Sequence, residues 1–177
     1  KRIITGHGID TNLFKMSRPA GDHPKGENLK NIDEITILSV GRITPSKGHD
    51  LIINAFSDLK KSGYNLRLKI IGGVIQDYHQ KYLESLKKLI SDLKIDEAVE
   101  FSGPVSYEKM SEYLTNSEIL VNAVPFGGLD KVVLEAMASG VIPLTSNSAF
   151  LSVFPQEISA DLVLNPSVDG GNIEDFK

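Results

Sequence analysis

The chain has 177 residues, of which 41% are hydrophobic and 24% are charged. This length is enough for one compact domain with a substantial core, and a second domain of full size would not fit. The formal net charge of -4 gives no general attraction to nucleic acid or to an anionic membrane, so any anion site must be local. The sequence has no cysteine for a disulfide or a thiolate metal site, and no apolar run approaches the length that spans a bilayer.

Strand-like and helical patterns alternate along the chain, which is typical of βαβ units in a mostly parallel sheet. Short apolar runs predict strands at residues 35–40, 66–71, 99–101, 119–121 and 142–144, with 162–164 as a candidate sixth strand. Amphipathic spacing predicts helices at 47–60, from Asp77 to Leu93, from Ser106 to Leu114, and at 131–139, with Gly140 as the stop. Asp77 and Ser106 are expected to cap their helices, and residues 11–31 are predicted to be a surface loop. The predicted fold class is therefore α/β, with a Rossmann-like doubly wound parallel sheet.

In such a sheet, ligands bind in the crevice at the carboxyl ends of the strands, so the loops after the strands are the candidate site. Arg42 and Lys47 lie five residues apart between the first strand and the first helix. The amino terminus of that helix adds unpaired N–H groups at the same place, and the combination suits a diphosphate. The pattern alone leaves open that Arg42 and Lys47 are two solvated loop cations.

A glycine-rich turn before the helix at 131–139 offers a second half of the same site. Its residues are Gly127, Gly128, Leu129, Asp130 and Lys131. Glycine lets a ligand approach the backbone, and the helix dipole favours negative charge there, while Asp130 is predicted to cap the helix. Glu135 lies about one turn inside the helix, where it can accept hydrogen bonds from a ribose or can be an ordinary exposed glutamate.

The acidic and histidine residues do not form a metal-binding pattern. The sequence has no Asp-x-Asp, and its histidines are scattered at positions 7, 23, 49 and 79. We therefore expect no metal and no other cofactor. His49 and His79 are interpreted as helix-surface residues, whereas His7, between two glycines, could face the crevice. The P-loop spacing and the Gly-x-Ser-x-Gly elbow are both missing from the sequence.

A set of short motifs occurs in a defined order over most of the chain. The set consists of Gly41-Arg42 through Lys47-Gly48, the strand ends Ile70-Ile71-Gly72-Gly73 and Phe101-Ser102-Gly103, and Leu134-Glu135-Ala136-Met137-Ala138-Ser139-Gly140 with Pro143. It resembles the carboxyl-terminal donor-binding domain of GT-B, family 4 (group 1) glycosyltransferases. The resemblance implies that Arg42 and Lys47 hold the diphosphate of a nucleoside diphosphate sugar, expected to be UDP-linked, and that Glu135 binds its ribose. The other implied donor-binding residues are Gly41, Gly72, Gly103, Gly127, Gly128, Leu129, Asp130 and Lys131.

The same resemblance implies a retaining, metal-independent glycosyltransferase of the hexosyltransferase type, with a role in polysaccharide biosynthesis. These enzymes place an acceptor-binding domain before the donor domain. We therefore expect residues 1–177 to be a nucleotide-sugar (donor) binding domain excised from a longer two-domain protein, inactive alone, with that amino-terminal domain as its partner. We expect a cytoplasmic protein without a transmembrane segment or a nucleic-acid partner, whose peripheral contact with a membrane would be made by the missing domain.

Position 127 departs from the family pattern. The family commonly has two glutamates eight positions apart, and Gly127 stands where the partner of Glu135 would be. That glutamate normally lies near the donor sugar, so the identity of the sugar stays open. Two other functions also remain open: a non-catalytic nucleotide-binding module, and a sugar nucleotide epimerase of related fold.

Overall fold

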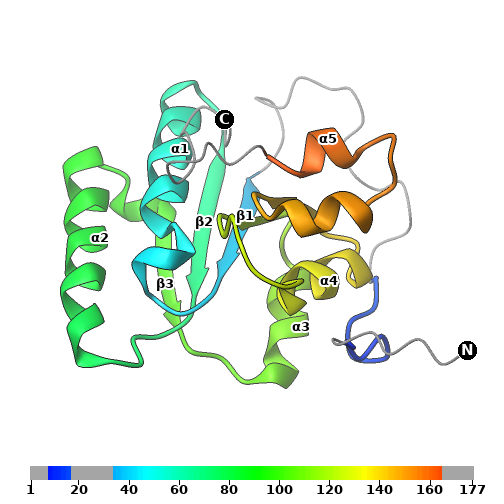
Figure 1. The fold of residues 1–177 in the computed structure, drawn as a ribbon. Helices are drawn as coiled ribbons and strands as arrows, with labels where there is room; N and C mark the ends of the chain where they lie inside the picture. Colours follow the sequence, from blue (N-terminus) through cyan, green and yellow to red (C-terminus); the bar gives the residue numbers. More distant parts are fainter. Residues whose placement is uncertain (1–7, 17–33, 165–177) are drawn as a thin grey trace, which may run out of the picture.

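The computed structural model describes residues 8–16 and 34–164 and shows one parallel sheet with helices on both faces (Figure 1). The five strands lie in the order β3-β2-β1-β4-β5. Their bounds are β1 Ile35–Val40, β2 Leu66–Ile71, β3 Val99–Gly103, β4 Ile119–Asn122 and β5 Ile142–Thr145. The order reverses between β1 and β4, both of which run parallel to each other and to their outer neighbours. The predicted doubly wound sheet is confirmed, and the topological switch point lies between β1 and β4.

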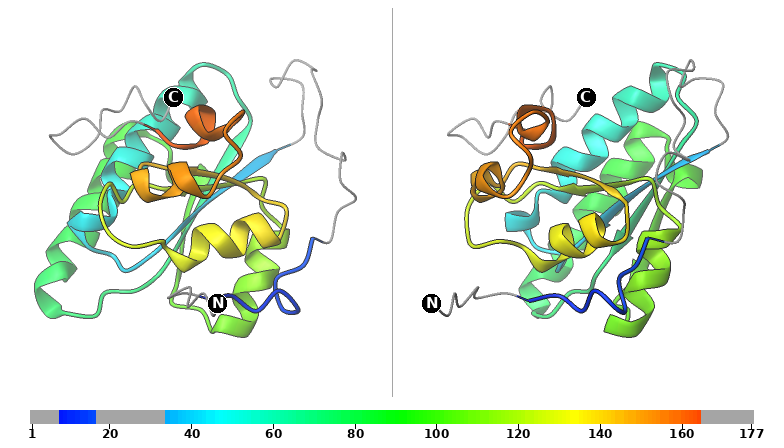
Figure 2. Two further views of the ribbon diagram at one scale, coloured as in Figure 1. Left: turned by 45° about the vertical axis from the view of Figure 1, so that its right-hand side comes forward. Right: turned by 90° about the vertical axis from the view of Figure 1, so that its right-hand side faces the viewer.

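The helices alternate with the strands. Their bounds are α1 His49–Lys61, α2 Gln80–Leu93, α3 Tyr107–Thr115, α4 Lys131–Ala138 and α5 Ser159–Leu162. Short 3-10 helices precede or follow them, namely η2 Pro45–Lys47, η3 Asp77–His79, η4 Asp96–Ala98 and η5 Ser148–Ser152. In the two views of Figure 2, β1 passes between α1 on one side and α4 on the other. No helix within these described ranges is long and apolar enough to cross a bilayer.

Alternate residues of the strands pack into two separate cores, one on each face of the sheet. Ile37 belongs to the core beneath α1 and α2, and its neighbour Leu38 belongs to the core beneath α3 and α4. Ile70 and Ile71 of β2 divide in the same way. This is the period-2 pattern of a strand buried on both faces, which explains why these runs are nearly continuous in apolar residues.

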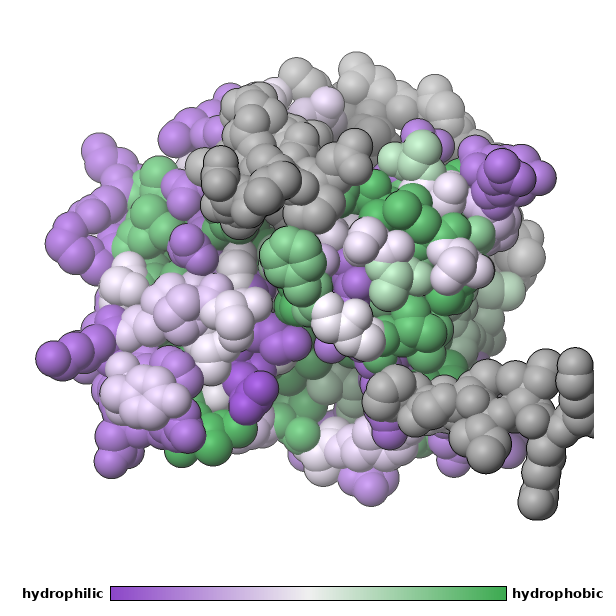
Figure 3. All heavy atoms as spheres, in the orientation of Figure 1, coloured by the Kyte–Doolittle hydropathy of each residue, from purple (hydrophilic) through white to green (hydrophobic). Residues whose placement is uncertain are grey.

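The outer surface differs between the two halves of the molecule. Figure 3 shows hydrophilic side chains over the helices at the left of the view and hydrophobic atoms gathered at the right, over η5 and α5. Leu151 of η5 and Ile158, just before α5, are among the exposed large hydrophobic residues. On their inner side, Phe150 and Phe154 anchor this segment in the core beside α4.

The first helix begins two residues later than the predicted Lys47. Gly48 adopts the left-handed conformation, with φ 61°, and separates η2 from α1. A side chain at Gly48 would also meet the Cβ of Ala123 at 2.8 Å, so this position joins the first loop closely to the end of β4. Gly48 therefore separates η2 from α1, whereas the sequence pattern indicated one continuous helix from Lys47.

The predicted sixth strand at residues 162–164 is wrong. Leu162 ends α5, and only Val163 forms an isolated bridge, with Thr145 of β5. The surface loop predicted at 11–31 is confirmed in its described part, because residues 11–16 belong to no helix or strand and most of them are exposed, although Phe14 is buried in the core under α3 and α4. The rest of that loop, from residue 17, lies outside the described residues. The predicted cap at Asp77 is wrong, because Asp77 is the first residue of η3 and the N-cap residue of α2 is His79. Ser106 is the N-cap residue of α3, as predicted, but its side chain makes no capping hydrogen bond.

Candidate functional site

Two adjoining clefts lie at the carboxyl ends of β1 and β4, at the switch point of the sheet. The first cleft, of about 750 Å³, opens between the loop at 42–51 and the loop at 123–130. The second cleft, of about 560 Å³, lies toward α4 and reaches from Val40 to Glu135. Both clefts are lined by Arg42, Lys47, Gly128 and Asp130, which therefore form the wall between them.

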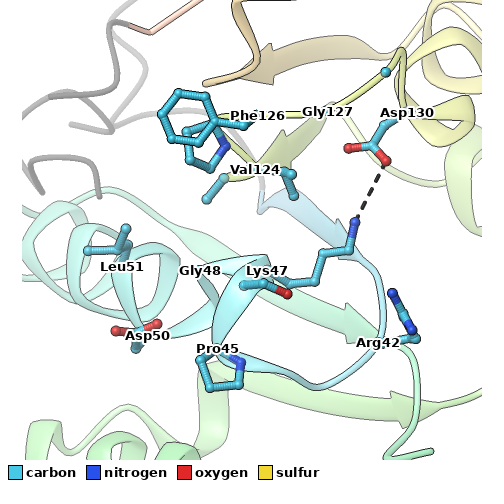
Figure 4. Close-up of a pocket in the computed structure, with 14 residues that line it drawn as sticks. Arg42, Pro45, Lys47, Gly48, Asp50, Leu51, Val124, Phe126, Gly127 and Asp130 are labelled. Carbon is cyan, nitrogen blue, oxygen red and sulfur yellow. Dashed lines mark ion pairs between the residues drawn. The ribbon is translucent and has the colours of Figure 1, made fainter. Parts of the chain in front are cut away.

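Lys47 and Arg42 reach this shared wall from one loop, as expected. Lys47 ends η2, and its methylene groups lie along Gly41, where a Cβ atom would come within 3.2 Å of the lysine Cδ. Figure 4 shows the Lys47 side chain extending across the first cleft, with the Arg42 side chain beside it. The opposite wall of the cleft carries Val124 and Phe126. Two cations that line the same clefts at the edge of the sheet suit an anionic ligand.

Asp130 meets Lys47 across the cleft. The Lys47 Nζ lies 3.6 Å from the Asp130 Oδ1, and the Asn122 Nδ2 donates a hydrogen bond of 3.1 Å to the Asp130 Oδ2. Asp130 occupies the N-cap position of α4, but its side chain makes no capping hydrogen bond. The prediction that this carboxylate caps the helix is therefore wrong, because Lys47 and Asn122 take both of its oxygens.

A buried polar network supports the glycine-rich turn from below. Thr145 Oγ1 donates to Asn122 Oδ1 at 3.1 Å, and Asn147 Nδ2 donates to the carbonyl oxygen of Gly128 at 3.0 Å. The backbone N–H of Asn147 in turn donates to Thr145 Oγ1. Sequence reasoning missed Asn122, Thr145 and Asn147. The available signal was that polar residues end or follow the apolar runs of β4 and β5, whose carboxyl ends meet at the same edge of the sheet.

His49 is buried, and the interpretation of it as a helix-surface residue is wrong. Its side chain is 1% exposed, and it lies between Ser39 Oγ and the carbonyl oxygen of Arg42, each 3.2 Å from one ring nitrogen. Burial lowers the pKa of His49, although the Arg42 carbonyl and the nearby Asp50 oppose this effect. The ring thus joins β1 to the loop that carries Arg42. His79 is half-buried in η3, and His7 lies outside the described residues.

Glu135 is buried at the inner end of the second cleft. Its side chain is 5% exposed, in the middle of α4. Burial raises the pKa of Glu135, and the positive charge of Lys131 lowers it only in part. The alternative of an ordinary exposed glutamate is therefore excluded. A carboxylate kept in such a place at a cost in stability is typical of a ligand-binding group.

Glu135→Gln is expected to stabilise the folded chain at neutral pH, by on the order of 1 kcal/mol or about 2 to 4 °C in Tm. Because the folded-state pKa of Glu135 is raised, the stability that Glu135 contributes below its ordinary pKa of 4.5 is lost as the pH rises through the folded value. The gain in stability from Glu135→Gln should therefore appear at pH values above the folded-state pKa of Glu135 and disappear below its ordinary pKa of 4.5. Thermal unfolding of both proteins across this pH range measures the difference.

The control for this substitution is Glu84→Gln, on an exposed position of α2. It should leave the Tm nearly unchanged at every pH, because an exposed carboxylate keeps its hydration in the folded state. A Glu135→Gln protein that is no more stable than the wild type at neutral pH would show that burial of the carboxylate carries no cost.

Most of the remaining expected site residues line one of the two clefts, and two of them line neither. Gly127 lines the first cleft, whereas Gly41, Leu129 and Lys131 line the second. Gly72 and Gly103 line neither cleft and instead join adjacent strand ends, since the Gly72 N–H donates to the Gly103 carbonyl at 3.0 Å. The assignment of donor-binding roles to all these residues stays a prediction. Within the described part of the chain, no group of three histidine, aspartate or glutamate residues could hold a metal ion.

Comparison with known proteins places this arrangement in a family. The sequence model described as "Glycosyl transferases group 1" matches residues 23–158. The chain belongs to this family. The match includes the loop with Arg42 and Lys47, the glycine-rich turn and Glu135, so the sequence resemblance is confirmed.

Curated relatives in the family carry names of mannosyltransferases. The chain is 34% identical over 136 residues to a GDP-Man:Man(3)GlcNAc(2)-PP-Dol alpha-1,2-mannosyltransferase of Eremothecium gossypii, covering 73% of this chain and 23% of the relative. It is 26% identical over 174 residues to a GDP-mannose-dependent alpha-(1-6)-phosphatidylinositol monomannoside mannosyltransferase of Mycobacterium tuberculosis, covering 94% of this chain and 42% of the relative. The chain thus spans less than half the length of these relatives.

Solved structures share the fold at lower identity. The C-terminal domain of a glycosyl transferase group 1 family protein (LpcC) from Francisella tularensis has a TM-score of 0.68 at 21% identity, with 88% of this chain and 86% of that one covered. Anabaena Alr3699/HepE in complex with UDP-glucose has a TM-score of 0.65 at 20% identity, covering 84% of this chain and 39% of that one. These likenesses show that the fold is that of GT-B glycosyltransferase domains.

Proposed function

We propose that this chain binds the nucleoside diphosphate sugar of a glycosyltransferase that transfers the sugar with retention of configuration and without a metal. The observation that carries the proposal is that Arg42, Lys47 and the amino terminus of α4 meet at one wall between two clefts. Guanidinium, ammonium and free helix N–H groups are the groups that a diphosphate requires. Membership of the group 1 family supports the reaction class.

In the proposed reaction, the rate enhancement comes from stabilisation of the leaving diphosphate. As the bond between the sugar and the diphosphate breaks, negative charge grows on the departing oxygen. Both cations line the cleft before this happens: the methylene groups of Lys47 lie along Gly41, and the backbone carbonyl of Arg42 lies 3.2 Å from a ring nitrogen of His49. Preorganised charges of this kind stabilise a developing anion without the cost of reorienting solvent. Glu135 supplies hydrogen-bond acceptors for the ribose in the second cleft.

The names of similar proteins indicate two different bases for the donor nucleotide. The curated relatives, at 26 to 34% identity, are named for GDP-mannose, whereas the solved neighbour at 20% identity was crystallised with UDP-glucose. The UDP-linked donor expected from the sequence has the weaker support, because likeness at that identity concerns the fold alone. GDP-mannose is therefore the first donor to test, followed by UDP-glucose.

The chain is expected to bind GDP or UDP in the presence of EDTA and to transfer no sugar by itself. Binding persists because two cations replace the metal that other nucleotide sites use, and transfer fails because the acceptor is bound elsewhere in a longer protein. Isothermal titration calorimetry with GDP, UDP and their mannose and glucose conjugates measures the first point, with and without EDTA. Incubation with donor and a panel of acceptors measures the second.

The control ligand is free mannose or glucose, which lacks the diphosphate and should not bind measurably. An absolute need for magnesium or manganese would overturn the metal-independent mechanism, and transfer by this chain at the rate of a full-length relative would overturn the two-domain proposal. Nucleotide binding without any turnover by the complete protein would favour the non-catalytic module. Interconversion of free sugar nucleotides would favour the epimerase.

A further inference from the structure

The lysine that the proposed function assigns to the diphosphate forms an ion pair with a carboxylate of the same chain. The ammonium of Lys47 faces the carboxylate of Asp130 at 3.6 Å, and the two side chains are only 20% and 28% exposed. Figure 4 shows this ion pair crossing the first cleft. A diphosphate that binds Lys47 must therefore take the place of Asp130 or share the ammonium with it.

The carboxylate of Asp130 is held in position from the side opposite Lys47. Asn122 Nδ2 donates to Asp130 Oδ2 at 3.1 Å, and Asn122 is fixed in turn by Thr145 of β5. Asn122 and Thr145 are 4% and 0% exposed, so the support of the carboxylate is buried in the sheet edge. Lys47, by contrast, reaches the pair through a long side chain that lies along Gly41. The terminal ammonium can turn from Asp130 to a ligand while the methylene groups stay along Gly41, whereas the carboxylate is held by Asn122.

The orientation of Asp130 also leaves the amino terminus of α4 open to a ligand. Asp130 is the N-cap residue of this eight-residue helix, and its side chain makes no hydrogen bond to the helix N–H groups. The first N–H groups of a helix have no partner within the helix. A carboxylate that capped α4 would compete with a bound diphosphate for these N–H groups. The Asp130 carboxylate instead competes with the diphosphate for the ammonium of Lys47.

We propose that Asp130 is a positioning residue that holds Lys47 at the wall between the clefts when the site is empty and releases it to the diphosphate on binding. This inference rests on the proposed function. The diphosphate outcompetes the carboxylate because it carries more charge and also engages Arg42 and the α4 amides. Asp130 stays nearby, anchored by Asn122, and repels the bound diphosphate. Its presence therefore weakens the hold on the nucleotide, including the nucleoside diphosphate left after sugar transfer.

The test is the affinity of Asp130→Asn for GDP and UDP, measured by calorimetry on the whole chain. The asparagine Oδ1 still accepts the hydrogen bond from Asn122, but the competing charge is gone. We expect affinity to rise by about fivefold, the upper end of the range for loss of a partly exposed ion pair. Asp130→Ala serves as a second variant and should show the same direction of change.

The matched control is Asp50→Asn, which removes one negative charge from the lining of the same first cleft. The Asp50 carboxylate accepts a hydrogen bond from Tyr82 Oη at 2.8 Å and does not pair with Lys47, so the change in affinity should stay below about twofold. A second arm places Asp130→Asn in a Lys47→Met background. In that background, Asp130→Asn should raise the nucleotide affinity much less than it does when Lys47 is present, because the proposed exchange of partners requires the Lys47 ammonium.

Each outcome bears on a distinct statement. If the wild-type chain binds no nucleotide, the proposed function fails and the inference fails with it. If the wild type binds but Asp130→Asn and Asp130→Ala, both folded by thermal unfolding, bind no more tightly, the inference alone is wrong. An equal gain in Asp50→Asn, or an undiminished gain in the Lys47→Met background, would show general electrostatics rather than exchange of Lys47 and would also overturn it.

Discussion

Arg42→Ala and Lys47→Ala should each lower kcat of the complete enzyme by about 10² or more, with a smaller effect on the donor KM. Both cations reach the wall shared by the two clefts, where the diphosphate is proposed to lie. The bridging oxygen that they face gains charge only as the sugar departs, so their interaction strengthens in the transition state. Steady-state kinetics over a range of donor concentrations separate kcat from KM.

Glu135→Gln should instead affect the donor KM more than kcat. Hydrogen bonds to a ribose are present before and during bond cleavage, so their loss should mainly raise the donor KM. The control is Lys61→Ala at the far end of α1, where Lys61 pairs with Asp58 at 3.8 Å, outside both clefts. It should leave both parameters unchanged. If folded Arg42→Ala and Lys47→Ala proteins also stay near the wild type, these residues are solvated loop cations and the site assignment is wrong.

Gly72→Ala should destabilise the chain by about 3 kcal/mol or more and should also weaken nucleotide binding. Gly72 has φ 148°, and a Cβ atom there would meet the carbonyl oxygen of Gly41 at 1.8 Å. Neither atom belongs to a flexible side chain, so the backbone of Gly41 must move. Gly41 directly precedes Arg42 and lies against Lys47, and the movement would therefore misplace both cations. Chemical denaturation and calorimetric titration with GDP measure the two effects.

The matched control is Gly103→Ala at the end of the neighbouring strand. Gly103 also has a positive φ, of 70°, but a Cβ atom there meets nothing within 4 Å. We expect only the backbone strain of about 1 kcal/mol, so this variant is the control for the loss of stability alone. If Gly72→Ala costs no more than Gly103→Ala, the close approach of β1 and β2 at this edge does not constrain the site.

The regular elements could be predicted from the sequence because their signals are local. The runs at residues 35–40 and 66–71 coincide with β1 and β2, since each is a short, mostly apolar stretch followed directly by a glycine. The doubly wound sheet follows from βα alternation, and the rule that ligands bind at the carboxyl ends of the strands directed attention to the loops that line the two clefts. The residues of the two loops, Arg42, Lys47 and 127–131, were therefore found without knowledge of the structure.

What the sequence did not reveal depends on contacts between distant segments. His49 has the polarity of a surface residue, but it stands at the first turn of α1 facing Ser39 of β1. Asp130 has the composition of a helix cap, but Lys47, from the loop after β1, and Asn122 of β4 draw its carboxylate away. Residues 162–164 look like a strand, but only Val163 bridges to Thr145 of β5. For His49 and Asp130, a tertiary contact outweighs the local preference.

The strand order has a consequence for the way the chain folds. β1, β2 and β3 are neighbours in both sequence and space, so they pair across shorter stretches of chain than β1 and β4 do. β4 must instead return past them to pair with the free side of β1, and Asp130 meets Lys47 only after that pairing. A growing chain that has emerged as far as β3 carries both cations but not the wall opposite them. Affinity for nucleotide should therefore appear late in folding, as a sign that the last half of the sheet has joined the first.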